Sequence, residues 1–204
     1  MPTFMLENQF AGPVAGIDEA GRGPLAGPVV AACVHVFDRS LPFFGLVRDS
    51  KKLTAHKREA LFTEITRHCA FGIAVAEPGE IDRYNILQAT FLAMGRAVDA
   101  LTLAFDVKLE TLLVDGNHKP RGLEKYDLRP VIKGDDKSVS IACASILAKV
   151  TRDRLMRELH AAHPQYGFDR HMGYPTAAHV AAIQAHGPCP HHRRSFAPVR
   201  AATV

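Results

Sequence analysis

Short apolar runs rich in β-branched residues predict five strands. Val14–Ile17 and Val29–Phe37 are the first two, and the glycines and prolines at 23–28 predict a turn that joins them into a hairpin. The other three strands are expected over Phe71–Ala76, Thr111–Gly116 and Pro130–Ile132.

Helical periodicity separates these strands. Leu61, Ile65 and Cys69 recur at four-residue spacing in a helix that is expected to begin after Thr54, a suitable N-cap. Further helices are expected over Asn85–Leu103, Ser138–His160 and Thr176–His186. This order of elements predicts an α/β fold in which helices cover one mixed sheet.

Length and composition narrow the class of protein. The 204 residues are 47% hydrophobic, enough for one well-buried domain with a helical appendage. We expect no membrane partner, since no apolar run approaches the length of a membrane span, and the N-terminus lacks a signal-peptide pattern. The four cysteines form no Cys-x-x-Cys pair, and three of them lie in apolar periodic segments typical of reduced core residues, which favours a cytoplasmic location.

The distribution of charge is more informative than the net charge of +4. From Arg170 to Val204 there are four arginines and no acidic residue. Two other basic clusters occur, one with Arg48, Lys51, Lys52, Lys57 and Arg58, the other with Lys149, Arg152, Arg154 and Arg157. One such cluster is usually a solvated face, but three beside a carboxylate site favour a polyanionic substrate.

Two adjacent carboxylates, Asp18 and Glu19, follow the first strand directly. Burying two ionised carboxylates side by side is costly unless a cation compensates them. Adjacent strand residues point to opposite faces, so we expect the chain to kink after Asp18, with Gly21 and Gly23 giving the necessary freedom. This pattern favours a divalent metal site, and a polar turn is the alternative.

Carboxylates recur at the ends of two later strands, at Asp115 and Asp135. Each has an alternative interpretation, because Asp115-Gly116 is a common turn and Asp135-Asp136 can cap the next helix. Their recurrence together with Asp18 and Glu19 favours a set of hard oxygen ligands for Mg²⁺ or Mn²⁺.

Other sites are excluded or disfavoured by their context. Residues 21–26 fit the G-x-G-x-x-A dinucleotide fingerprint, but a strand follows where that fingerprint requires a helix. The P-loop and G-x-S-x-G patterns are absent. The later histidines and one cysteine lack closed zinc spacing, so we expect surface or phosphate-facing histidines. These residues are His160, His163, His186, Cys189, His191 and His192.

Several segments in order resemble the ribonuclease HII family, the type 2 ribonucleases H. They are residues 16–31, 49–53, 85–90, 114–117, 140–156, 166–168, 173–176 and 192–196. The resemblance implies a ribonuclease H-like fold, a five-stranded mixed sheet flanked by helices. It also implies a single catalytic domain over 1–204, with roughly 165–204 as a C-terminal helical extension that binds substrate.

The resemblance further implies endonucleolytic cleavage of RNA in RNA–DNA hybrids and incision 5′ to single ribonucleotides in duplex DNA, with Mn²⁺ or Mg²⁺ in a two-metal mechanism. It places the catalytic, metal-binding carboxylates at Asp18, Glu19, Asp115 and Asp135. The implied substrate-binding residues are Gly21, Arg22, Gly23, Ser50, Lys51, Lys52 and Tyr174, and we add Arg193 and Arg194 from the basic tail.

Two departures from the family pattern stand out. Met172 occupies a position where the family usually has lysine, and Asp136 follows Asp135 where a small or basic residue is usual. We take Asp135 as the fourth ligand because it follows Gly134 directly, as in the motif. The competing hypotheses are a non-catalytic nucleic-acid-binding module, a type 1 ribonuclease H and a structure-specific nuclease. No protein partner is evident, and we expect a monomer.

Overall fold

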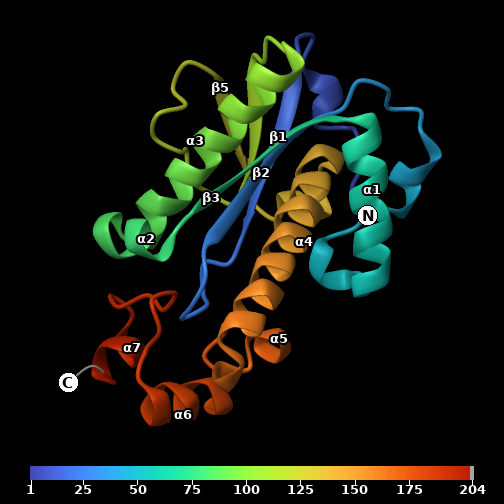
Figure 1. The fold of residues 1–204 in the computed structure, drawn as a ribbon. Coiled ribbons are helices and arrows are strands. Elements are labelled where there is room, and N and C mark those ends of the chain that lie inside the picture. Colours follow the sequence, from blue (N-terminus) through green and yellow to red (C-terminus); the bar gives the residue numbers. More distant parts are fainter. Residues whose placement is uncertain (203–204) are drawn as a thin grey trace.

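The computed structural model describes residues 1–202 and contains a five-stranded sheet with helices on both faces (Figure 1). Its strand order is β3-β2-β1-β4-β5. β2 pairs antiparallel with both β1 and β3, and β4 pairs parallel with both β1 and β5, so the sheet is mixed as predicted. The strands are β1 (Val14–Ala20), β2 (Val29–His35), β3 (Ala70–Ala76), β4 (Thr111–Asp115) and β5 (Asp127–Val131).

β1 continues beyond its predicted end. Asp18 lies opposite Ala32 and Glu19 opposite Ala31, so pairing with β2 keeps the backbone extended. The predicted kink after Asp18 is therefore wrong, and the two carboxylates lie on opposite faces of the sheet. The chain turns only at Gly21, whose φ of 96° suits glycine.

Four helices cover the two faces of the sheet (Figure 1). α2 (Pro78–Tyr84) and α3 (Ile86–Phe105) lie on one face, and α1 (Ala55–His68) and α4 (Val139–Ala162) lie on the other. The prediction located α1, α3 and α4. It did not locate α2, which begins with a capping box between Glu77 and Glu80.

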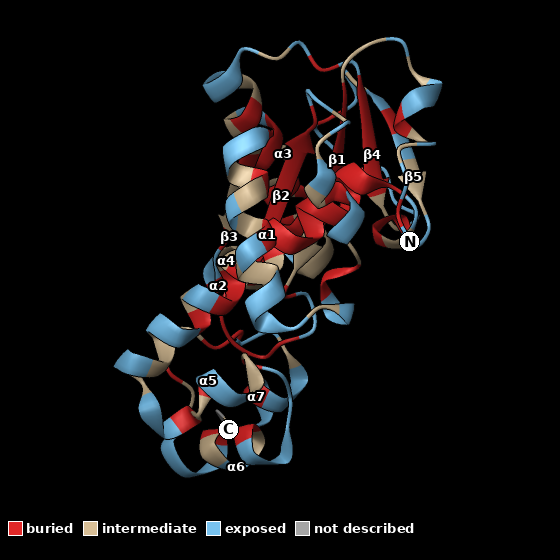
Figure 2. Ribbon diagram, turned by 90° about the vertical axis from the view of Figure 1, so that its right-hand side faces the viewer, coloured by how far each residue is buried: buried red, intermediate tan, exposed pale blue. Residues whose placement is uncertain are grey.

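Each face of the sheet buries its own apolar layer (Figure 2). α3 is the one helix among residues 1–202 that is long and apolar enough to cross a membrane. The sequence analysis had expected no apolar run of that length. Its Ala93, Ala97 and Leu101 are fully buried in the layer that also contains Ile17 and Ala31 of the sheet. Its apolar face is therefore part of the domain core.

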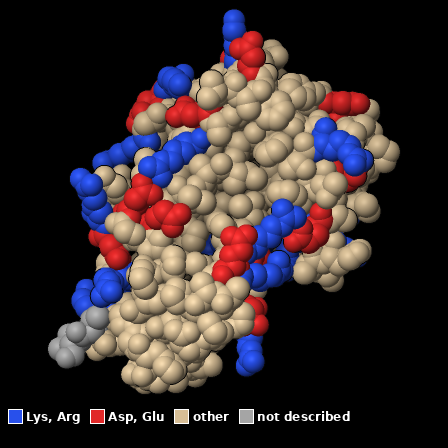
Figure 3. Space-filling model, viewed as in Figure 1, with Lys and Arg blue, Asp and Glu red and all other residues tan. Residues whose placement is uncertain are grey.

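The C-terminal elements form a smaller layer at the far end of α4 (Figure 1). Leu25 and Ala26 of the β1–β2 loop are buried in the core of this layer, together with Met156 of α4. The loop therefore lies between the sheet and the C-terminal elements. On the face shown in Figure 3, this region carries few charged side chains. Its elements are η5 (Pro164–Tyr166), α5 (Phe168–His171), α6 (Ala177–His186) and α7 (Ala197–Ala201).

Candidate active site

Parallel pairing brings the carboxylate segments to one edge of the sheet. Ile17 of β1 is level with Val114 of β4, so Asp18 and Asp115 follow at the same height. β5 runs parallel to β4, and the chain then enters a short 3-10 helix, η4 (Gly134–Asp136). Since parallel strands end at the same edge, Asp135 arrives at the same place.

Asp115 is the common neighbour of the other three carboxylates. Burial, and then the charges of Glu19 and Asp115, hold the pKa of Asp18 well above its ordinary value. Burial also raises the pKa of Glu19, and Asp115 adds to this effect. Burial and then the charge of Asp115 raise the pKa of Asp135. The group therefore carries more negative charge than its surroundings compensate.

Local bonds orient three of these carboxylates. Asp18 Oδ1 accepts a hydrogen bond from the Glu19 backbone N–H at 2.7 Å, and Arg22 Nη1 lies 3.3 Å from Glu19 Oε1. Asp115 Oδ1 accepts from the Gly134 N–H at 2.7 Å. A Cβ on Gly134 would lie 3.1 Å from that oxygen, so glycine permits this close approach. The backbone thus fixes the site before any ligand binds.

The chemistry of this set suits a divalent cation. Among residues 1–202, no three His, Cys, Asp or Glu side chains already stand together as metal ligands. The side chains nevertheless offer hard oxygens that are partly buried and repel one another. Within the same residues, Asp18, Asp115 and Asp135 form no ion pair with Lys, Arg or His. A divalent cation would relieve this repulsion.

A cleft of about 290 Å³ lies beside the carboxylates, and Tyr174 lies on its wall. A second hollow of similar volume includes Asp115 and Thr90. Glu19 and Arg22 line both hollows and separate them. The side chains and backbone around the first cleft belong to Glu19, Ala20, Gly21, Arg22, Gly23, Ser50, Lys51, Ser145, Lys149, Arg152 and Tyr174.

Six of the predicted substrate-binding residues reach this cleft: Gly21, Arg22, Gly23, Ser50, Lys51 and Tyr174. Burial opposes the charge of Lys51, but the carboxylates around it, Asp49 and Asp135 first, raise its pKa. Tyr174 is 45% exposed, so its ring is available to a ligand.

Lys52, which the resemblance assigns to phosphate binding, does not line this cleft. Its Nζ lies 2.5 Å from Asp136 Oδ1 in an exposed ion pair, and it lines a separate groove beside α1. This ion pair also distinguishes the two candidates for the fourth ligand. The Asp136 side chain binds Lys52, whereas Asp135 is 8% exposed and its pKa is raised by the charge of Asp115. The structure therefore favours Asp135 over Asp136 as a member of the carboxylate group.

The structure also contradicts the assignment of Arg193 as a phosphate contact. Arg193 is fully buried, and its guanidinium donates only to backbone carbonyls of the β1–β2 loop. These carbonyls have no strand partner, so a buried donor satisfies them. Arg194 does not line the cleft; its backbone N–H donates to Asp82 Oδ2 at 2.9 Å. Arg152 of the second basic cluster is buried as well.

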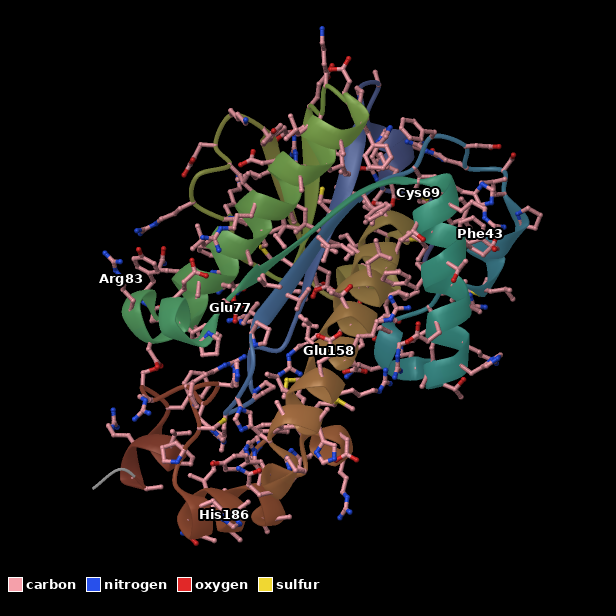
Figure 4. The ribbon with its side chains drawn as sticks, viewed as in Figure 1. Phe43, Cys69, Glu77, Arg83, Glu158 and His186 are labelled. Carbon is pink, nitrogen blue, oxygen red and sulfur yellow. The ribbon has the colours of Figure 1, made fainter. Side chains whose placement is uncertain are left out.

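The expectation of surface histidines is wrong for His192, which is 1% exposed. Its Nδ1 accepts from the Cys189 N–H at 3.0 Å, and its Nε2 lies 3.1 Å from Nε2 of the buried His179. His179 Nδ1 in turn lies 2.9 Å from the Tyr174 carbonyl and must donate to it. The pair therefore anchors the backbone at Tyr174. His186, by contrast, is exposed at the end of α6 (Figure 4).

Sequence reasoning missed several residues beside the site. Ser145 lines the cleft. Its Oγ is hydrogen-bonded to Ser50 Oγ at 2.9 Å, and its side chain is also hydrogen-bonded to Asp18. Lys149 follows four positions later and also lines the cleft, so i,i+4 spacing on α4 was an available signal. Asp49, the first residue of the segment 49–53, also acts on the site, because its charge raises the pKa of Asp135. Asn117 and His118 line the second hollow.

Comparison with known proteins agrees with this geometry. A model of the family described as Ribonuclease HII matches residues 15–199. The chain belongs to the ribonuclease HII family. It is 62% identical over 192 residues to the ribonuclease HII of Dechloromonas aromatica, covering 92% of each chain. It is 51% identical over 199 residues to that of Wolbachia pipientis, covering 98% of each.

Solved structures support the same fold. The ribonuclease H2 of Pyrococcus horikoshii superposes with a TM-score of 0.77 at 26% identity, covering 93% of this chain and 96% of that one. The Bst ribonuclease HIII in complex with Mn²⁺ gives a TM-score of 0.72 at 21% identity, covering 100% and 73%. The chain thus has the ribonuclease H-like fold and is a type 2 ribonuclease H, an endoribonuclease acting on RNA–DNA hybrids.

Proposed function

We propose that the protein is a metal-dependent endonuclease that also incises 5′ to a single ribonucleotide embedded in duplex DNA. The observation that carries this proposal is the meeting of Asp18, Glu19 and Asp135 around Asp115, beside a cleft lined by the glycine loop and Tyr174. A binding module would gain nothing from carboxylates there, since they repel phosphate without a cation.

The four carboxylates would hold Mg²⁺ or Mn²⁺. Two such ions, when bound, supply an activated water and stabilise the leaving oxygen of a phosphodiester. The chain's own contribution is the fixed arrangement of oxygens, through the bonds to Asp18, Glu19 and Asp115 described above. Mn²⁺ in the complex of Bst ribonuclease HIII, which has the same fold, is consistent with this proposal.

The cleft offers no activated side-chain nucleophile. Its two serines, Ser50 and Ser145, lie 2.9 Å from each other, and among the residues that line it there is neither a cysteine nor a histidine. Water would attack the phosphorus in line with the P–O3′ bond; that bond breaks, so the new P–O bond leaves a 5′-phosphate and the departing O3′ takes a proton to give a 3′-hydroxyl. Lys51 at the cleft would supply positive charge for the strand's phosphates. Lys149 lines the cleft as well, but its Nζ lies 2.7 Å from Asp153 Oδ1.

Selectivity for RNA would come from the 2′-hydroxyl, the group that distinguishes ribose from deoxyribose. Because Gly21 and Gly23 carry no side chain, backbone N–H groups of this loop would approach a ribose closely. Tyr174 would stack against the neighbouring sugar from a backbone that His179 anchors.

Three labelled duplexes test the proposal: one with a single ribonucleotide, its all-deoxy twin, and an RNA–DNA hybrid. With Mg²⁺ or Mn²⁺ we expect incision 5′ to the ribonucleotide, cleavage of the hybrid and an intact all-deoxy duplex, and with EDTA no cleavage. Binding without cleavage would indicate a nucleic-acid-binding module. Cleavage of the hybrid alone would indicate type 1 behaviour, and equal cutting of both DNA duplexes a general nuclease.

A further inference from the structure

Glu7 is a buried carboxylate in the N-terminal segment, far along the chain from most of the candidate active site. It begins the short 3-10 helix η1 (Glu7–Gln9) and is 2% exposed. Within residues 1–202 it forms no ion pair with Lys, Arg or His. A buried charge without a counter-ion is costly unless hydrogen-bond donors compensate it, so the partners of Glu7 indicate its role.

The Glu7 carboxylate binds the start of α4. Its Oε1 accepts hydrogen bonds from Ser138 Oγ at 2.6 Å, from Ser140 Oγ at 2.8 Å and from the Ser140 backbone N–H at 2.9 Å. Its Oε2 is buried and has no partner among residues 1–202. Ser138 is the N-cap of α4, a helix of 24 residues, and a negative charge at this end suits the helix dipole. Glu7 therefore clamps the first turn of α4.

The segment that carries Glu7 is itself held in place. The Phe4 ring packs edge-on against the buried Phe44, with 5.1 Å between the ring centroids. The Thr3 backbone N–H donates to the Lys137 carbonyl at 3.1 Å. Neither contact involves the Glu7 carboxylate, so the segment presents this carboxylate to α4 as a fixed acceptor.

The clamped turn of α4 directly follows η4, which carries Asp135. The Gly134 carbonyl accepts from the Ser138 backbone N–H at 2.8 Å. The Gly134 N–H donates to Asp115 Oδ1 at 2.7 Å. This short turn is therefore tied to Asp115 at one end and, through Ser138, to Glu7 at the other. Because Asp135 lies inside the turn, the position of its carboxylate depends on both ends.

β1 holds the start of α4 from another side. A Cβ on Gly16 would overlap the backbone N of Ile141, so the first turn of α4 packs directly on β1, two residues before Asp18. Further along α4, the Ser145 side chain is hydrogen-bonded to Asp18. A shift of the start of α4 against β1 would therefore move Asp135 away from Asp18.

We propose that Glu7 is a positioning residue, which fixes the start of α4 through Ser138 and Ser140 and so holds the Asp135 carboxylate beside Asp115 for metal binding. Glu7 lines neither hollow of the candidate active site, so it acts without contact to metal or substrate. Replacing groups that orient metal ligands commonly lowers metal affinity by about 10- to 100-fold. The inference rests on the proposed function, since it takes Asp135 as a metal ligand.

Glu7→Gln tests the proposal, because glutamine keeps the length of the side chain and one oxygen acceptor but loses the charge. Glu80→Gln is the matched control. Glu80 accepts from the Glu77 backbone N–H at 3.0 Å at the start of α2 and pairs with Arg96, on the opposite face of the sheet from α4. Both substitutions should lower Tm. Mn²⁺ binding without nucleic acid, followed by the EPR signal of the free ion, should weaken about tenfold in Glu7→Gln and less than about twofold in Glu80→Gln.

A double-mutant cycle separates positioning of Asp135 from general loss of stability. In an Asp135→Asn background, Glu7→Gln should weaken Mn²⁺ binding less than about twofold, because the ligand that Glu7 positions is already gone, while Tm should still fall. A tenfold loss in both backgrounds, or equal losses in Glu7→Gln and Glu80→Gln, would overturn the proposal. If Asp135→Asn alone binds Mn²⁺ as tightly as the wild type, the metal site of the proposed function is refuted instead.

If Glu7→Gln does not fold, Ser140→Ala provides the same test. It removes one of the three donors to Glu7 Oε1 and leaves the backbone N–H of residue 140 in place. Mn²⁺ binding should weaken about threefold in the wild-type background and stay unchanged in the Asp135→Asn background. The same loss in both backgrounds, or no loss in either, would show that this clamp does not position Asp135.

Discussion

Asp18→Asn should make the metal-free protein more stable and nearly inactive. The substitution keeps the shape of the side chain, and asparagine Oδ1 can still accept from the Glu19 N–H, a bond of 2.7 Å. What it removes is one charge in a buried setting, where Glu19 and Asp115 repel it and raise the pKa of Asp18.

The expected magnitude follows from electrostatics. At an effective dielectric of about 20, a like charge about 6 Å away costs about 3 kcal/mol. Relaxation of the neighbouring side chains relieves some of this repulsion, so we expect a net gain of about 1–2 kcal/mol in unfolding free energy. For a domain of this size that raises Tm by about 2–8 °C. Loss of a ligand should slow cleavage by about 10³-fold or more, equivalent to about 4 kcal/mol.

The assay pairs thermal melts at pH 8, in EDTA and in Mn²⁺, with single-turnover cleavage of the single-ribonucleotide duplex. Asp18→Asn should melt higher than the wild type in EDTA and gain less from Mn²⁺. Asp127→Asn, at an exposed position paired with Arg129 on β5, is the matched control and should cleave like the wild type. A lower Tm in EDTA together with a rate within about tenfold of the wild type would refute the reasoning.

Three further predictions test other parts of the structure. Asp135→Asn should remove most activity at saturating Mn²⁺ while Asp136→Asn keeps most of it; the reverse rates would make Asp136 the ligand. Burial lowers the pKa of His192 to about 4 in the folded protein, so as pH falls the unfolded chain takes up a proton at His192 before the folded protein does. The free energy of unfolding should therefore fall as pH drops from about 6.5 to 4. Urea titrations should show a weaker fall in His192→Gln, and an equal fall would remove His192 as its source. Gly72→Ala places a Cβ 2.0 Å from the Ala97 carbonyl oxygen and should cost about 1–3 kcal/mol, whereas Gly95→Ala, with open space around its Cβ, should gain about 0.5–1 kcal/mol in the same titrations.

Local pattern predicted most of the sheet and the long helices. β-branched runs and Gly-Pro punctuation located β1 to β4, and the cap at Thr54 located the start of α1. For β5 the prediction began at Pro130, whereas the strand begins at Asp127. The meeting of Asp18 with Asp115 was also accessible, since carboxylates at strand ends converge when the strands run parallel. The kink after Asp18 failed because pairing with β2, a long-range interaction, decides the backbone there.

Burial of charge could not be read from charge counts. Arg193 and Arg194 are adjacent in an acid-free tail, yet one is fully buried and the other exposed. The difference comes from unpaired carbonyls some 170 positions earlier in the chain, at Gly21 and Arg22. The partner of Lys52, Asp136, also comes from a distant segment, so this ion pair could not be read from charge counts either.

The most direct test of the central claim is to locate Mn²⁺ by anomalous diffraction from crystals of the protein bound to a duplex with a non-cleavable ribonucleotide linkage. The proposal predicts Mn²⁺ among Asp18, Glu19, Asp115 and Asp135, with the ribonucleotide in the cleft beside Gly21–Gly23 and Tyr174. Mn²⁺ bound at Asp136 or elsewhere, with these four carboxylates empty while the same crystals hold the duplex, would contradict it.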